Sequence, residues 1–308
     1  MDTYRGSLIH SRREFALTQQ NINVSACGTS YSPIAVWVDM IALAANGYAD
    51  LYTLLDREHV PIEHIKCPLS PNSRAEVARA RQYRPVLLHC WGPPGYSVTR
   101  PVIPEPELLI ELAQSSGTPF LSVHLDYQPA IDGERERNAV LTHVRQEVAG
   151  LKRLANMEVL LENVPWYPWL NQPRWATDPD FITEAVNGSD ALLLVDTAHA
   201  RVAAWHRGES AEEYLAALPL DRAWEIHVSG PRMTDEGLRD RHMALTEEDY
   251  TLLKFVLNHA PNVRHITLEY VGRREKTAHY NEPDGPELLA EQLARLDAIR
   301  TGSVQVKR

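Results

Sequence analysis

The stretch ALLLVDTAHARVAAW, residues 191–205, decides the class of fold. The apolar run 192–195 ends in the acid Asp196, and an imidazole follows three positions later at His199. An apolar run that ends in a polar residue is typical of a buried parallel strand that emerges at the mouth of an α/β fold. Because the sites of such folds lie at these mouths, Asp196 and His199 are candidate site residues.

Further apolar, β-branched runs share this form, and amphipathic stretches alternate with them. We expect strands at residues 22–27, 62–67, 85–90, 120–125, 158–163, 191–196, 224–228 and 265–270. The helix-like stretches cover residues 73–83, 105–115, 137–155, 211–218, 247–259 and 285–299. Eight β runs that alternate with helices predict an α/β fold of the TIM-type (β/α)8 barrel class.

The start of the chain is the hardest part to assign. Residues 32–60 have a pattern that fits two helices, or a helix and a strand. A doubly wound open sheet is the alternative architecture, but no glycine-rich GxGxxG or P-loop turn follows any of the expected strands. We expect a single TIM-barrel domain over residues 1–308, with residues 1–20 as a candidate extension.

The composition is that of a soluble protein. Apolar residues make up 44% of the chain, but no uninterrupted apolar stretch approaches the roughly 20 residues that span a bilayer. The first residues, MDTYRGSLIHSRREF, are polar and charged, unlike a secretory signal. Cys27, Cys67 and Cys90 show no CxxC spacing, which argues against a disulfide framework and a thiolate zinc site. We therefore expect a cytoplasmic protein with reduced, buried cysteines and no membrane partner.

Six consecutive expected strands carry a potential metal ligand at or near the C-terminal end. These residues are His89, His124, Glu162, Asp196, His227 and Glu269. Three more potential ligands are His199 and, in the loop expected after the seventh strand, Asp240 and His242 of RDRH. A barrel brings its strand ends onto one ring, so these residues can converge on a common centre. Nine donors exceed what one ion uses, which indicates two or three metal ions.

Each of these residues alone has an ordinary structural explanation. A histidine such as His227 is often a hydrogen-bonded residue of the barrel mouth, and Glu162 can cap the loop that follows it. Asp240 and His242 can form a surface ion pair. The joint pattern is harder to explain in this way, because burying such groups unpaired is costly. We interpret all nine residues as metal ligands and the six at the strand ends as catalytic.

The ligand order resembles two related families of the xylose-isomerase-like barrels. The series His, His, Glu, Asp-x-x-His, His, Asp-x-His, Glu is similar to endonuclease IV, a trinuclear zinc TIM barrel that cleaves DNA at abasic sites. The sequence between the ligands looks more like the multinuclear non-heme iron-dependent oxidative enzymes, the family that includes the methanobactin-biosynthesis oxygenase. The motifs are LLENV at 160–164, EYLAALP at 213–219, EIHVSG at 225–230 and the Asp-x-His of 240–242.

This resemblance runs from about residue 85 to 272 and fades before residue 60. One departure is DTAHA, where the better-known iron enzymes carry asparagines after the acid. The resemblance implies three ligand sets, with Glu162 bridging the first two. The first is His89, His124 and Glu162; the second is Asp196, His227 and Glu269; the third is His199, Asp240 and His242.

The identity of the metal does not follow from the ligands, because imidazoles and carboxylates suit iron or manganese as well as zinc. Charge adds a constraint. Four ligating carboxylates against three divalent ions leave the cluster about two units positive, which favours an anionic ligand such as a thiolate, carboxylate or phosphate.

Net charge and the expected rim loops favour a peptide over DNA as the substrate. The chain has 41 acidic and 31 basic residues, and this balance opposes attraction to nucleic acid. The loops at 89–97 and 163–175 are rich in aromatic residues and proline, which can bind a peptide segment or stack on bases.

We therefore expect an iron- and dioxygen-dependent oxidoreductase of peptide natural-product biosynthesis. The resemblance implies two or three iron ions, Fe2+ or Fe3+, and a substrate residue, cysteine, in a ribosomally synthesised precursor peptide. It also implies a separate partner protein that binds the leader peptide. One alternative is an endonuclease IV-like phosphoesterase with zinc or manganese. Another is a metal-dependent sugar isomerase or epimerase, which explains the Glu-Asp-His-Glu core but not the remaining ligands.

Overall fold

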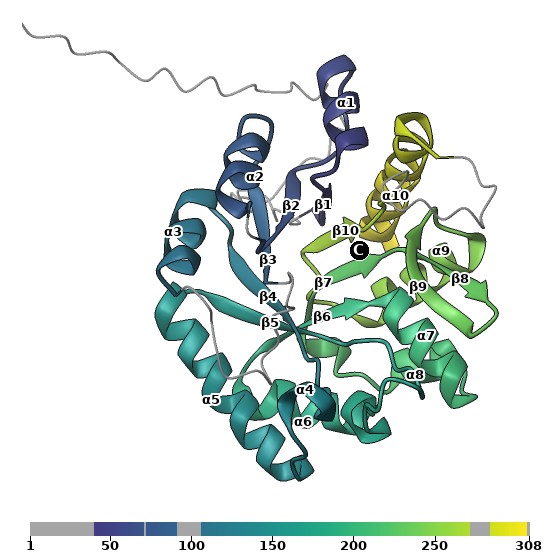
Figure 1. The fold of residues 1–308 in the computed structure, drawn as a ribbon. Coiled ribbons are helices and arrows are strands. Elements are labelled where there is room, and N and C mark those ends of the chain that lie inside the picture. Colours follow the sequence, from purple (N-terminus) through teal and green to yellow (C-terminus); the bar gives the residue numbers. More distant parts are fainter. Residues whose placement is uncertain (1–39, 71, 91–105, 272–283, 307–308) are drawn as a thin grey trace, which may run out of the picture. The chain divides into compact units, whose positions relative to one another are not determined.

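The computed structural model describes residues 40–70, 72–90, 106–271 and 284–306. They form a closed barrel of parallel strands with helices outside it (Figure 1). Around the barrel the order is β1-β10-β7-β6-β5-β4-β3-β2. These strands are β1 Ala42–Asn46, β2 His64–Pro68, β3 Val86–Cys90, β4 Phe120–His124, β5 Glu158–Glu162, β6 Leu192–Asp196, β7 Ala223–Val228 and β10 His265–Leu268. The predicted (β/α)8 barrel is confirmed.

The helices are α1 Ala49–Arg57, α2 Ser73–Ala80, α3 Pro106–Ser116, α4 Pro129–Asp132, α5 Arg137–Ala155, α6 Pro179–Ser189, α7 Thr197–Arg207, α8 Ala211–Ala216, α9 Glu247–His259 and α10 Pro286–Val306. Six of the helices, α2, α3, α5, α8, α9 and α10, lie at the amphipathic stretches expected from the sequence, and α4, α6 and α7 were not expected. Two short 3₁₀ segments, η1 Arg174–Thr177 and η2 Leu220–Arg222, complete the set among the described residues. Within this part of the chain, no helix combines the length and the apolar character that crossing a bilayer requires.

The first strand of the barrel differs from the prediction. We expected it at residues 22–27, which lie outside the described residues, but β1 is Ala42–Asn46 and the barrel closes through its pairing with β2 and β10. Its sequence, ALAAN, has low β propensity, so burial between two neighbouring strands decides its conformation. The described part of the ambiguous segment, residues 40–60, holds a strand and a helix, which is one of the two expected arrangements.

The expected single domain over residues 1–308 extends into residues 1–39, and these residues, with the candidate extension 1–20, lie outside the described part of the chain. The barrel itself belongs to a compact unit, Val38–Arg308.

A second difference follows β7. The segment expected to be a loop forms an antiparallel hairpin, β8 Gly230–Thr234 and β9 Gly237–Met243. Its polar sequence, PRMTDEGLRDRH, gives no clear apolar alternation, which is why the sequence did not indicate a strand. Asp240 and His242 therefore lie on a strand and not in an irregular loop.

The interior of the barrel is built from alternate residues of each strand. Near the N-terminal ends, a small apolar cluster contains Ala44, Leu87, Phe120, Leu160 and Leu194. In β4, Phe120 is followed by Ser122 and then by the predicted ligand His124 at intervals of two residues. In β3, β5 and β6 the predicted ligand lies only two residues beyond the apolar residue. The change from apolar to polar inside the barrel is what places the ligands at its C-terminal mouth.

Candidate metal centre

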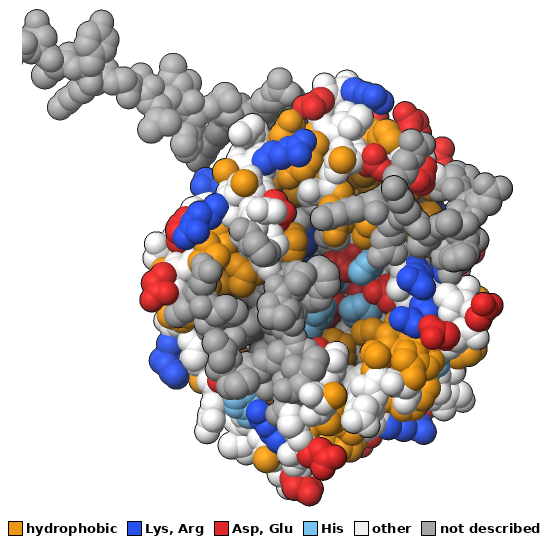
Figure 2. Space-filling view, viewed as in Figure 1, with side chains coloured by type: hydrophobic (Ala, Val, Ile, Leu, Met, Phe, Trp, Pro, Cys, Tyr) orange, Lys and Arg blue, Asp and Glu red, His pale blue; other side chains and the backbone are white. Residues whose placement is uncertain are grey.

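The nine predicted ligands come together at the mouth of the barrel. Figure 2 shows histidine and acidic side chains gathered in the hollow at the centre of this face. The ligand atoms form four groups, within each of which the atoms lie within 4.8 Å of one another. Three of these groups are the three predicted ligand sets, and the fourth, Glu162, Asp196 and His199, joins them. Their binding of metal stays a prediction.

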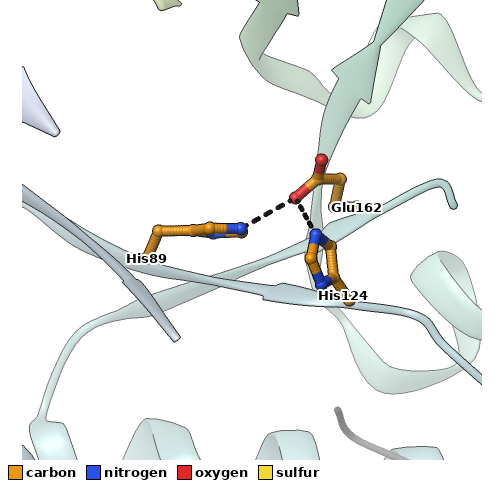
Figure 3. Close-up of side chains that lie close together, drawn as sticks. All are labelled: His89, His124 and Glu162. Atoms are coloured by element: carbon orange, nitrogen blue, oxygen red, sulfur yellow. Dashed lines mark ion pairs between the residues drawn. The ribbon is translucent and has the colours of Figure 1, made fainter. Parts of the chain in front are cut away.

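The first group lies at the ends of β3, β4 and β5. Figure 3 shows the imidazoles of His89 and His124 pointing toward the carboxylate of Glu162. Oε2 of Glu162 lies 3.2 Å from Nε2 of His89 and 3.3 Å from Nε2 of His124. The two rings meet edge to face, with centroids 4.9 Å apart.

The second group lies at the ends of β6, β7 and β10. Nδ1 of His227 is 3.3 Å from Oε1 of Glu269 and 4.0 Å from Oδ2 of Asp196. The same nitrogen is 3.4 Å from Oε1 of Glu162. Glu162 thus presents one oxygen to each of the first two groups, which is the arrangement that a bridging carboxylate requires.

The third group joins the start of α7 to the hairpin. Oδ2 of Asp240 lies 3.5 Å from Nε2 of His199 and 3.2 Å from Nε2 of His242. Nε2 of His242 is also 3.4 Å from Oε2 of Glu269, which links this group to the second. His242 has a left-handed backbone with φ 48°, and its carbonyl accepts the amide N–H of Val271 at 3.0 Å.

The helix start explains the spacing of DTAHA. Asp196 is the N-cap of α7, and its Oδ1 accepts the backbone N–H of His199 at 2.7 Å. This bond starts the helix directly at the end of β6 and turns His199 toward the mouth. The other oxygen of Asp196, Oδ2, stays available to the second group. The acid and the imidazole three residues later are therefore positioned by one another.

The fit to metal ions rests on buried polar atoms without hydrogen bonds. Within the described part of the chain, both carboxylate oxygens of Glu162, Oδ2 of Asp196, Nδ1 of His227 and Nε2 of His242 find no hydrogen-bond partner. Burying such atoms unsatisfied is costly. Two ligands about 2.1 Å from one ion, at angles of about 90–110°, lie about 3.0–3.4 Å apart. The contacts of 3.2–3.4 Å between these residues match that spacing.

The electrostatics of the site separate its histidines. Burial lowers the pKa of His89 to about 3. Burial also opposes charge on His227, but Glu269, Glu162 and Glu225 outweigh it and raise its pKa to about 10. For His242, Asp240 and Glu269 likewise overcome burial and raise the pKa to about 9. Without metal these acids hold protons on the histidines, and a cation in the same place would replace those protons.

Sequence reasoning missed the residues that support the ligands from below. Glu225 precedes His227 by two positions and Ser122 precedes His124 by two, so both point into the barrel behind a ligand. Lys66 is a third interior residue, 1% exposed. The signal was present in the strand period, but charged residues inside a barrel are uncommon without a partner that the sequence does not reveal.

The rim of the mouth is partly described. The predicted loop 89–97 lies outside the described residues from residue 91 on. In the loop 163–175, Tyr167 stacks on Trp169 with ring centroids 5.2 Å apart, and the guanidinium of Arg239 lies 4.7 Å from the Tyr167 ring centroid. The hydroxyl of Tyr167 accepts the backbone N–H of Asp240 at 3.0 Å. This aromatic loop therefore holds the hairpin that carries the third group.

Residues 109–278, more than half of the 308-residue chain, match the family described as RiPP precursor modification enzyme MbnB/TglH/ChrH. Among curated proteins, a UPF0276 protein of Anaeromyxobacter is 30% identical over 105 residues, 33% of this chain and 36% of that protein. A UPF0276 protein of Paraburkholderia phytofirmans is 33% identical over 92 residues, 30% of each chain. The matched stretch spans about a third of the length of these relatives.

Solved structures share the fold at low sequence identity. A D-tagatose 3-epimerase-like protein has a TM-score of 0.56 at 12% identity, covering 86% of this chain and 98% of that chain. An IolI protein with a bound zinc atom has a TM-score of 0.53 at 14% identity, with the same coverage. An AP endonuclease, family 2, from Brucella melitensis has a TM-score of 0.52 at 14% identity, covering 84% and 99%. The predicted xylose-isomerase-like barrel is confirmed.

Proposed function

Because the chain belongs to the RiPP precursor modification enzyme family MbnB/TglH/ChrH, we propose that it uses iron and dioxygen to modify a cysteine of a ribosomally synthesised precursor peptide. The family is one of enzymes that modify such precursor peptides. The observation that carries the proposal is the cluster of buried nitrogen and oxygen donors around Glu162, whose oxygens face two different ligand groups.

Each ligand group would hold one ion through three side chains. Three protein ligands leave coordination positions open for water or substrate. A set of imidazoles and carboxylates accommodates iron. The excess positive charge of a three-ion cluster favours a substrate that binds as an anion, as a cysteine thiolate does. Bound iron would supply the one-electron chemistry with dioxygen that amino-acid side chains lack.

The protein's own part is to hold the ligands and to bind the peptide. A cavity of about 790 Å³ is lined by residues of the segments that follow β4 and β5, among them Tyr127, Arg135, Gln172 and Trp175. Trp169, 41% exposed, adds an aromatic surface on the same loop as Gln172 and Trp175. Aromatic and guanidinium groups of this kind support binding of an extended peptide segment. A separate leader-peptide-binding partner protein is part of the proposal.

The test is dioxygen uptake by the ferrous protein, prepared anaerobically, with a cysteine-containing precursor peptide encoded by a short reading frame beside the gene. We expect uptake together with a mass change of that peptide. The control peptide carries serine in place of the cysteine, and we expect neither uptake nor a mass change. Equal uptake with both peptides, or none with either, contradicts the proposal.

The third ligand group also favours a second candidate, an endonuclease IV-like phosphoesterase. His199 in DTAHA is the residue that this reading explains best, because it completes a group with Asp240 and His242. The net charge of −10 disfavours a DNA substrate. Zinc-loaded protein and an abasic-site duplex decide between the candidates: cleavage at an enzyme-like rate without dioxygen supports the phosphoesterase.

A further inference from the structure

A buried polar layer lies beneath the candidate ligands. The ammonium of Lys66 is 2.8 Å from both carboxylate oxygens of Glu225 and 3.1 Å from Oγ of Ser122. The hydroxyl of Thr267 donates to Oε1 of Glu225 at 2.6 Å. All these side chains are buried, and they come from four different strands, β2, β4, β7 and β10. The layer spans the barrel behind both of the first two ligand groups.

The layer constrains the second group through His227. Oε1 of Glu225 lies 3.3 Å from Nε2 of His227, while Nδ1 of the same ring faces Glu162 and Glu269. A carboxylate held by Lys66 and Thr267 accepts hydrogen bonds and does not donate them. Nε2 of His227 makes no hydrogen bond in this geometry, but the carboxylate oxygen at 3.3 Å would repel its lone pair, so this nitrogen is the one that carries the proton. The lone pair of Nδ1 is then directed at the candidate metal position.

The layer constrains the first group through His89. Oγ of Ser122 lies 2.9 Å from Nδ1 of His89 and accepts from Lys66. Its own proton points toward the carbonyl of Leu88 at 3.4 Å. With its donor used in this way, the Ser122 oxygen accepts a hydrogen bond from the Nδ1–H of His89. Nε2 of His89 is left with its lone pair toward Glu162.

The ring of a third histidine, His199, is oriented by a hydrogen bond to Asn163, the residue that follows β5. Nδ1 of His199 lies 2.9 Å from the backbone carbonyl of Asn163, which can only accept. The side chain of Asn163 donates to the carbonyl of Asp196 and accepts its N–H, both at 2.9 Å, and so locks β5 to β6. His199 therefore has only Nε2 for a metal, and that atom faces Asp240.

We propose that these buried partners determine which nitrogen of three histidines faces the metal centre. These nitrogens are Nδ1 of His227, Nε2 of His89 and Nε2 of His199. Glu225, balanced by Lys66, is the positioning residue for His227. Because Nδ1 of His199 is occupied, the group of Glu162, Asp196 and His199 does not form a site of its own, and His199 belongs to the third group. The inference rests on the metal centre of the proposed function but not on its iron or dioxygen chemistry.

Charge explains why the layer contains a lysine. Glu225 alone would add a fifth carboxylate to the four of the candidate ligands and would bind a cation nonspecifically. The Lys66 ammonium neutralises it, while one of its oxygens accepts from Thr267 and faces Nε2 of His227. The layer thus orients a ligand without changing the net charge of the centre.

The direct test is the protonation of each imidazole nitrogen in zinc-loaded protein labelled with ¹⁵N-histidine. Long-range ¹H–¹⁵N correlation spectra should show the proton on Nε2 of His227 and on Nδ1 of His89 and His199, with assignments from single histidine-to-glutamine variants. A His227 ring that binds zinc through Nε2 overturns the inference while leaving the metal centre intact. Failure of the protein to bind zinc, manganese or iron overturns both.

A matched pair of double variants tests the role of Glu225. Lys66→Met with Glu225→Gln keeps an acceptor for His227 without a charge, whereas Lys66→Met with Glu225→Leu removes it. We expect the affinity for the first equivalent of zinc per chain to be about 10–100-fold lower in the leucine variant than in the glutamine variant. Equal affinity in the two folded proteins overturns the positioning role. Should the leucine variant fail to fold, the proton positions in the unmutated protein still decide the question.

Discussion

Replacing Glu162 by glutamine should remove more metal than any change outside the nine ligands. The carboxylate is 1% exposed, and its two oxygens lie 3.2–3.4 Å from nitrogens of four histidines. Glutamine has the same shape, but one of its two terminal atoms becomes an NH₂ group and the negative charge disappears. One of the two facing groups must then lose its carboxylate oxygen.

The expected size of the effect follows from the burial of Glu162. Removing one partner of a buried ion pair costs about 3–5 kcal/mol. At about 1.4 kcal/mol per decade, this corresponds to a loss of about two to three and a half decades in metal affinity. The matched control is Glu158→Gln, at the first position of the same strand. Glu158 makes a surface ion pair with Lys152 at 2.8 Å, and such pairs contribute about 0–1 kcal/mol.

The assay is competition between each variant and a chelator of known affinity, read as zinc or iron retained per chain. Thermal unfolding of the metal-free proteins checks that both variants fold. We expect Glu158→Gln to retain metal like the unmutated protein and Glu162→Gln to lose it at far lower chelator concentration. Equal retention by the two variants would refute the bridging role of Glu162.

Three further outcomes are expected. Mild chelation should empty the third group first, because the His242 side chain is 30% exposed and that of His89 is 8% exposed. Metal analysis after partial chelation, with His242→Ala and His89→Ala proteins to identify the emptied group, would contradict this if the His89 group lost its metal first. Gly237→Ala should destabilise the fold by about 1–3 kcal/mol, since this residue has φ 103° and a Cβ there would clash with the ring of Trp205; an unchanged unfolding midpoint would count against this packing. In a variant whose other cysteines are serines, Cys67 should resist thiol reagents at pH 8, because burial raises its pKa to about 12; rapid labelling of the folded protein would show that it is accessible.

The barrel and the positions of most of the predicted ligands could be predicted from the sequence, because apolar runs and amphipathic patterns are local features of the chain. α5 and α9 were expected at the residues they occupy, since their amphipathic patterns are long and α9 follows the capping residue Thr246. Six of the nine predicted ligands could be placed because each lies at or near the C-terminal end of an expected strand, and parallel strands of a barrel end on one ring. Neither inference needed contacts between distant residues.

The parts that could not be predicted depend on tertiary context. β1, with the sequence ALAAN, is a strand because it lies between β10 and β2, and nothing in its own propensity indicates this. The sequence of the β8–β9 hairpin shows no clear apolar alternation. The hairpin is held by Tyr167, which lies in another loop. The pairing of Lys66 with Glu225 joins residues 159 positions apart. Such a pair is visible only when the fold brings the two strands together.

The most direct test of the central claim is the Mössbauer spectrum of protein reconstituted anaerobically with ⁵⁷Fe, combined with an iron count per chain. Glu162 facing two ligand groups predicts two or three iron ions per chain, with magnetic coupling between two of them that is lost in Glu162→Gln. A single uncoupled iron, or a spectrum unchanged by Glu162→Gln, would contradict the claim that these residues form one multinuclear centre.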